Sequence, residues 1–189
     1  MSIVRTIEYK GHHIDIYQDP DPENPRDWEN VGTMICQHRR YKLGDLTRMS
    51  FESAKEVYGK DNMLYLPLYL YDHSGITMST KPFSCPWDSG KVGYIFVTEE
   101  KVREQWNCKH ITEKIRKAVY TTLEAEVKLY DYYLTGHVYG YLIRGTGDGC
   151  WSFYGTDYED NGLLHSAKGD IESSIENDMP LFKACGVEV

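Results

Sequence analysis

Alternation of apolar and polar residues near the start of the chain predicts two short strands. In TIEYKGHHIDIY, Ile14 and Ile16 alternate with polar or aromatic residues, and Lys10 with Gly11 provides a turn. The next segment, QDPDPENPRDWEN, carries three prolines among its acids, which favours a loop. VGTMICQHRRY then has the pattern of a strand that ends in basic residues.

The most regular pattern is LYLPLYLY, at residues 64–71, where leucines alternate with tyrosines. Successive side chains of a strand point to opposite faces, so this segment predicts a strand with a leucine face and a tyrosine face. Pro67 cannot donate a ladder hydrogen bond, which places the strand at a sheet edge or indicates a bulge there. DHSG is a predicted turn, and ITMST and KVGYIFV are predicted strands.

Helical patterns occupy four further segments. Ser50 and Gly59 frame a short helix, and Thr98 begins another. A longer helix is predicted from about residue 112 to 134, because apolar residues recur there every three or four positions: Ile115, Val119, Leu123, Val127, Tyr130 and Leu134. After a hairpin across TGDG, residues 158–178 are only weakly helical, with interruptions expected at Gly162 and Gly169.

These elements predict an α+β fold in which a mostly antiparallel sheet packs with two or three helices. The chain of 189 residues is long enough for one sizeable core, and no linker or internal repeat interrupts it. We therefore expect a single α+β domain over residues 1–189. Its C-terminal segment from about residue 156 is more acidic, with eight acids against two lysines.

Composition adds two features to this picture. Sixteen tyrosines suit a binding surface, although strand positions also favour aromatic residues. The formal net charge of −8 argues against general nucleic-acid binding, which depends on neutralising phosphates. An acidic surface instead suits competition with nucleic acid for a basic groove, and the alternative is that the charge keeps the protein soluble.

The N-terminal sequence and the cysteines bear on the cellular compartment. MSIVRTIEYKG becomes polar too soon for an apolar targeting segment, and no apolar run approaches the length of a membrane span. The five cysteines are an odd number without C-x-x-C pairs, so reduced thiols are expected rather than a disulfide framework. We therefore expect a cytoplasmic protein without a membrane partner.

Four residues with metal-binding side chains form a candidate zinc site. Cys36 and His38 are two apart on one predicted strand and share a face, while His73 and Cys85 lie in the turn and loop of YDHSGITMSTKPFSCPWDSG, residues 71–90. Zinc accepts two cysteines and two histidines in tetrahedral geometry. The alternative is that these four residues have unrelated structural roles.

The stretch at 71–90 allows two other kinds of chemistry. Cys85 or Ser74 beside His73 provides a nucleophile and a base, although no G-x-S-x-G elbow frames either one. Asp72 and Asp88 provide two carboxylates for a divalent cation, but both residues also suit the starts of turns. We favour the turns for the aspartates.

The basic strip HRRYKLGDLTR suggests a phosphate contact through Arg39 and Arg40. Adjacent residues of a strand point to opposite faces, so the two arginines do not grip one phosphate together. We therefore expect this strip to pair with nearby acids, and the acidic loop at 19–29 is one candidate partner.

Three blocks of the chain resemble an uncharacterised family of small acidic proteins encoded by bacteriophages and prophages. The blocks are NPRDWENVGTMICQHRRY, LYLYDHSGITMSTKPFSCPWDSGKVGYIFV and YDYYLTGHVYGYLI, and the resemblance covers most of residues 15–155. It assigns no catalytic residue. Small acidic phage proteins often act against host defence, with anti-CRISPR and antirestriction proteins as leading examples, so the resemblance implies an anti-defence protein by analogy.

The first hypothesis is therefore a binding protein rather than an enzyme: a phage-derived inhibitor of a nuclease of host defence, with a CRISPR effector as the leading partner. Its candidate contact residues are acidic or aromatic: Asp19, Asp21, Glu23, Asp27, Trp28, Glu29, Tyr65 and Tyr69. The second hypothesis is a metal-dependent hydrolase or nuclease with its site around residues 36–38 and 72–88. A phage assembly or housekeeping protein is the third.

Overall fold

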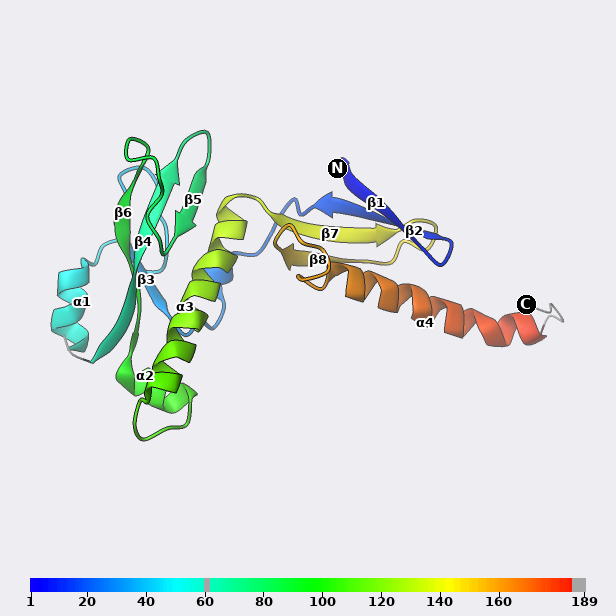
Figure 1. The fold of residues 1–189 in the computed structure, drawn as a ribbon. Helices are drawn as coiled ribbons and strands as arrows, with labels where there is room; N and C mark the ends of the chain where they lie inside the picture. The colour runs from blue at the N-terminus through cyan, green and yellow to red at the C-terminus, as the bar shows by residue number, and fades with distance from the viewer. Residues whose placement is uncertain (60–61, 185–189) are drawn as a thin grey trace. The chain divides into compact units, whose positions relative to one another are not determined.

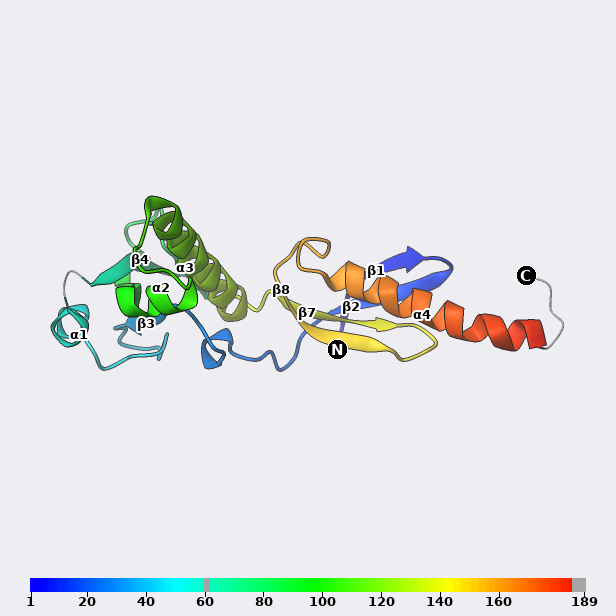
Figure 2. The same ribbon diagram turned by 90° about the horizontal axis from the view of Figure 1, so that it is seen from below.

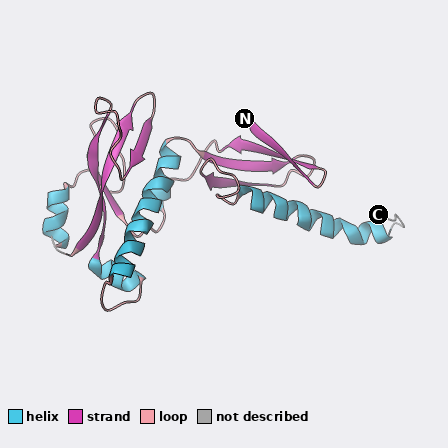
Figure 3. Ribbon diagram, viewed as in Figure 1, coloured by secondary structure: helices cyan, strands magenta, loops and turns pink. Residues whose placement is uncertain are grey.

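Two four-stranded antiparallel sheets and four α-helices form the computed structural model, which describes residues 1–59 and 62–184 (Figures 1 and 3). The predicted α+β class with antiparallel pairing is confirmed, although the described residues form two sheets rather than one and four α-helices rather than two or three. The chain divides into two compact units, which the sequence patterns did not distinguish. Unit 1 comprises residues 1–23 and 136–189, and unit 2 comprises residues 24–135.

Unit 1 is a four-stranded meander with one helix. Its sheet has the order β1-β2-β7-β8, and its elements are β1 (Ile3–Tyr9), β2 (His12–Gln18), β7 (Val138–Ile143), β8 (Gly149–Tyr154) and α4 (Leu163–Ala184). The β1–β2 hairpin turns at Lys10 and Gly11, as predicted, and both residues have positive φ angles. Helix α4 starts beside the end of β8 and runs along the sheet (Figure 2).

The core of unit 1 lies between this sheet and α4. Ile14 and Ile16 of β2 are fully buried, as their alternation predicted, and they pack with four residues of α4: Leu163, Leu164, Ala167 and Ile171. The helix continues through Gly169, where an interruption was expected. Burial of its apolar residues against the sheet offsets the weak helical propensity of a single glycine.

Unit 2 is inserted into unit 1 between two adjacent strands. β2 and β7 pair directly, with Gln18 opposite Tyr139, although more than a hundred residues separate them in sequence. Just beyond this pair, the backbone N–H of Asp19 donates to the carbonyl of Val138 (2.8 Å). The two strands that flank unit 2 in sequence are therefore hydrogen-bonded to each other in the sheet of unit 1.

Unit 2 has a sheet of order β3-β6-β4-β5 with helices on both faces (Figure 1). Its elements are the 3-10 helix η1 (Pro25–Asp27), β3 (Thr33–Cys36), α1 (Phe51–Tyr58), β4 (Met63–Asp72), β5 (Ile76–Ser79), β6 (Ser89–Thr98), α2 (Glu99–Gln105) and α3 (Glu113–Leu134). The hydroxyls of Ser50, Thr98 and Thr112 cap α1, α2 and α3, so the predicted helix starts are confirmed.

The two faces of the unit 2 sheet have separate cores. The larger core joins the leucines at 64, 68 and 70 of β4 to the predicted apolar stripe of α3, of which Val119, Leu123 and Val127 are buried. The smaller core, on the other face, contains Phe51 and Ala54 of α1, with residues from β3, β4 and β6. The leucine face and the tyrosine face of β4 are therefore as predicted.

Pro67 lies in the central strand β4, at a position where β4 is paired with a neighbouring strand on one side only. β6 pairs with β4 along its length, whereas β5 pairs only from Tyr69 to Asp72. A register shift between Leu68 and Tyr69 follows directly after the proline. Both features agree with the expectation that Pro67 marks an open edge or a bulge.

No helix in the described part of the chain is long and apolar enough to cross a membrane.

Candidate binding surfaces

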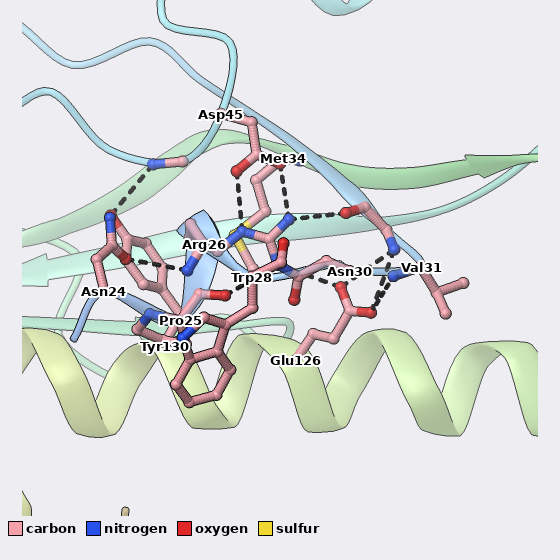
Figure 4. Close-up of polar contacts among 12 residues, drawn as sticks. Asn24, Pro25, Arg26, Trp28, Asn30, Val31, Met34, Asp45, Glu126 and Tyr130 are labelled. Carbon is pink, nitrogen blue, oxygen red and sulfur yellow. Dashed lines mark hydrogen bonds and ion pairs between the residues drawn. The ribbon is translucent and has the colours of Figure 1, made fainter. Parts of the chain in front are cut away.

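The segment that opens unit 2, residues 24–32, is anchored by one buried arginine (Figure 4). The guanidinium of Arg26 donates to both carboxylate oxygens of Asp45 (2.9 and 2.7 Å), to the carbonyl of Gly32 (2.7 Å) and to Glu126 of α3 (3.2 Å). The Glu126 carboxylate also accepts the backbone N–H of Val31 (2.7 Å). The side chain of Arg26 is 3% exposed, so this network is part of the fold rather than a surface contact.

Burial and ion pairing act on Arg26 in opposite directions. Burial of the guanidinium disfavours its charge, but the hydrogen bonds and charges of Asp45 and Glu126 outweigh that effect and raise the pKa of Arg26. The cation therefore stays charged and holds the loop against α3 and the segment after β3.

The acidic contact candidates divide between the two units. Asp27, Trp28 and Glu29 follow Arg26 in unit 2, where all three residues are exposed, Trp28 to 40%. Asp19 of unit 1 has a local structural role, because its carboxylate accepts hydrogen bonds from the backbone N–H groups of Asp21 and Ser152 (both 3.1 Å). The other two candidates of unit 1, Asp21 and Glu23, are exposed.

The four predicted zinc ligands do not meet in the structure. The Cys36 thiol is in the larger core of unit 2, where burial raises its pKa to about 12. His38 stacks on Tyr41 (5.0 Å between centroids), and its Nδ1 accepts backbone N–H groups. Within the described residues, no group of three or more His, Cys, Asp and Glu side chains is placed to hold a metal ion.

The other two predicted ligands meet at Asp88 instead. His73 Nδ1 lies 3.2 Å from the Asp88 carboxylate, and the Cys85 thiol donates to the same oxygen at 3.8 Å. The carboxylate thus lies between the thiol and the imidazole. A nucleophilic cysteine needs a base beside its sulfur, so this order of groups does not pair Cys85 with His73 as its base.

The stretch at 71–90 is therefore a polar sheet end that is tied together locally. The backbone N–H of Asp72 donates to the carbonyl of Asp88 (2.8 Å), and the Asp72 carboxylate pairs with Arg40 and accepts from Tyr41. Arg40 thus pairs with Asp72 rather than with the acidic loop proposed from the sequence. Trp87 in the same loop is 91% exposed, a feature that sequence patterns did not reveal.

Negative charge is concentrated in unit 1. This becomes visible only when charged residues are counted separately for the two units. Unit 1 contains 5 basic and 14 acidic residues, a formal charge of −9, whereas unit 2 contains 16 basic and 15 acidic residues, a charge of +1. The whole-chain value of −8 is thus the sum of a strongly acidic unit and a nearly neutral one.

Comparisons with protein-family models, with curated proteins and with solved structures found no match for this chain.

Proposed function

We propose that this protein is an inhibitor that binds a nucleic-acid-targeting nuclease of host defence, with unit 1 as the acidic contact surface. A CRISPR effector is the candidate partner that the resemblance to phage proteins suggests. The observation that carries the proposal is the segregation of charge, −9 in unit 1 against +1 in unit 2. A groove that binds phosphates is basic, and a compact acidic unit is complementary to it.

The basic residues of unit 1 offset little of this charge at the surface. Lys10, Arg144 and Lys168 form ion pairs within the unit, with Glu172, Asp15 and Glu159. A further set of acids is exposed: Glu8, Asp21, Glu23, Asp148, Asp157, Asp160 and Glu176. Concentrated charge of one sign raises the rate of encounter with an oppositely charged partner and makes that rate depend on salt.

The half-exposed Trp28, flanked by Asp27 and Glu29, is a second contact candidate, in unit 2. Indole rings are frequent anchors at protein interfaces because they bury much area at low entropic cost. The Arg26 network holds the backbone of this loop in place, so Trp28 is presented by an ordered segment.

The first experiment measures phage plating on bacteria whose CRISPR nuclease targets that phage, with and without this protein. Rescue of plating is expected, together with loss of DNA binding by the purified nuclease when the protein is added. Absence of rescue across several CRISPR types and restriction systems would remove the proposal.

A charge comparison then tests the surface itself. The variant Asp21→Asn, Asp160→Asn, Glu176→Gln removes three exposed charges from unit 1, and Glu56→Gln, Glu104→Gln, Glu124→Gln removes three from unit 2. At roughly 0.5 kcal/mol per exposed contact, the unit 1 variant should inhibit about tenfold more weakly, with a reduced dependence on salt. The unit 2 variant serves as the matched control, and an equal loss in both variants contradicts the assignment to unit 1.

A further inference from the structure

The face of the unit 2 sheet against which α1 packs carries tyrosines of β4 and β6. Tyr65, Tyr69 and Tyr71 of β4 lie opposite the leucine face, and Tyr94 lies on β6. We call these four residues with Lys91 the tyrosine face. Pro67 takes the position between Tyr65 and Tyr69 on this face, whereas Tyr69 and Tyr71 are direct neighbours, about 6.6 Å apart along the strand.

Packing against α1 holds two rings of this face, those of Tyr65 and Tyr94, in place. The ring of Tyr94 stacks on Phe51 of α1 (3.8 Å between centroids, 16° between planes), and Tyr65 meets Phe51 edge-on at 4.9 Å. Tyr65 is nonetheless 41% exposed, and Tyr69 and Tyr71 are half-buried. The face therefore combines fixed ring positions with access from solvent.

Lys91 gives the tyrosine face one positive charge. The exposed Lys91 donates from Nζ to the hydroxyl of Tyr94 (2.7 Å) and lies 4.8 Å from the centre of that ring. In the part of the chain that the structure describes, no carboxylate forms an ion pair with Lys91. Lys55 of α1 lies over Phe51 at 4.6 Å, although it shares its charge with Glu52. The whole-chain charge thus says little about this surface.

We propose that the tyrosine face binds single-stranded nucleic acid, with bases stacked on Tyr65 and Tyr69 and a phosphate paired with Lys91. β6 and β4 are the two central strands of a four-stranded antiparallel sheet, and aromatic rings on central strands are a common way for a sheet to stack unpaired bases. Stacking accepts every base, so binding should be tolerant of sequence. A duplex keeps its bases stacked inside and is excluded from this contact.

The test measures fluorescence anisotropy of labelled 12-nucleotide oligo-dT and oligo-U, and of a matching duplex, with the full chain at low and moderate salt. We expect both single strands to bind at least tenfold more tightly than the duplex, and the two arms separate DNA from RNA as the preferred ligand. No binding of either single strand, or equal binding of the duplex, overturns the proposal.

Variants locate the site. Tyr65→Leu should weaken oligonucleotide binding about tenfold, whereas Tyr65→Phe should retain it because the ring remains. Lys91→Gln removes one phosphate contact and should lower the slope of log affinity against log salt by about one. The matched control is Tyr132→Leu with Lys128→Gln, which removes another lysine–tyrosine contact, on α3 (5.6 Å). Equal losses in the control and in Tyr65→Leu contradict the assignment to the tyrosine face.

The results that would overturn this proposal differ from those that would overturn the inhibitor proposal. Loss of nuclease inhibition by Tyr65→Leu without any oligonucleotide binding would make the face a protein contact and overturn the proposal. Charge removal in unit 1 leaves the tyrosine face unchanged.

Discussion

Arg26 grips the carboxylate of Asp45 with two hydrogen bonds, 2.9 Å from Nε and 2.7 Å from Nη2, although the two residues are 19 positions apart (Figure 4). This fork-like contact fixes the direction of the guanidinium, whose remaining donors reach Gly32 and Glu126. One side chain thereby joins the first loop of unit 2 to the segment after β3 and to α3.

Replacing Arg26 with alanine should lower the free energy of unfolding of unit 2 by about 2–4 kcal/mol, because two carboxylates with little access to water lose their cation. Urea unfolding followed by circular dichroism measures the change. The matched control is Arg103→Ala, which breaks an exposed pair with Glu99 in α2 and should cost less than about 0.5 kcal/mol. A loss for Arg26→Ala as small as the control would show that the network contributes little.

Gly93 of β6 is required by a close approach of backbones. A Cβ added there would lie 1.8 Å from the carbonyl oxygen of Ile35 on β3, and a neighbouring backbone atom has no room to move aside. Gly93→Ala should therefore destabilise unit 2 by about 2–3 kcal/mol or prevent its folding.

Gly90 of the same strand gives the control. A Cβ there meets nothing within 4 Å, so Gly90→Ala should be neutral or slightly stabilising in the same urea measurement. A similar cost at both glycines would contradict the steric explanation and point instead to a general effect of alanine in β6.

The local elements were readable from the sequence because each carries its own signal. The stripe of α3 repeats at helical spacing, and the tyrosines of β4 alternate with leucines, so neither needs a distant partner to be identified. α4 was underestimated because its helix depends on burial of Ile171 and its neighbours against a sheet whose strands come from both ends of the chain.

The sites were harder to predict because they depend on which segments meet. Nothing near Cys36 in the sequence shows that its thiol faces the core, and nothing near Arg26 points to Glu126, which is 100 positions away. The charge of −9 in unit 1 was hidden for the same reason, since its acids lie in two segments separated by unit 2.

Residues 24–135 should fold on their own. They form one compact unit with two cores, and the strands that flank them, β2 and β7, already pair with each other. We expect the isolated segment to unfold cooperatively in urea, with a midpoint close to that of unit 2 in the full chain. The reciprocal variant, with Glu23 joined to Gly136 through a short turn, should retain a folded unit 1. Aggregation or non-cooperative unfolding of both pieces would show that the units depend on each other.

Unit 1 should lose stability in acid partly through Asp15. Asp15 is 5% exposed, and its carboxylate accepts a hydrogen bond from the hydroxyl of Thr6 (2.6 Å) and pairs with Arg144 (2.8 Å). The hydrogen bond from Thr6 is the main cause of a lowered pKa of Asp15, below its ordinary value of 3.8. The hydrogen bonds and the positive charge of Arg144 lower this pKa further, although burial opposes the shift.

A lowered pKa in the folded state means that the unfolded chain binds the proton more tightly. The stabilisation by Asp15 is therefore complete above the unfolded value near 3.8 and is lost as the pH falls through the folded value. Asp15→Asn should cost about 1–2 kcal/mol at pH 7, and the gap between variant and parent should narrow below pH about 4. Urea midpoints at pH 7, 5, 3.5 and 2.5 test this, with the exposed Asp160→Asn as control. A gap that stays constant over this range would mean that the Asp15 charge contributes nothing, and that the cost of the variant comes from altered packing alone.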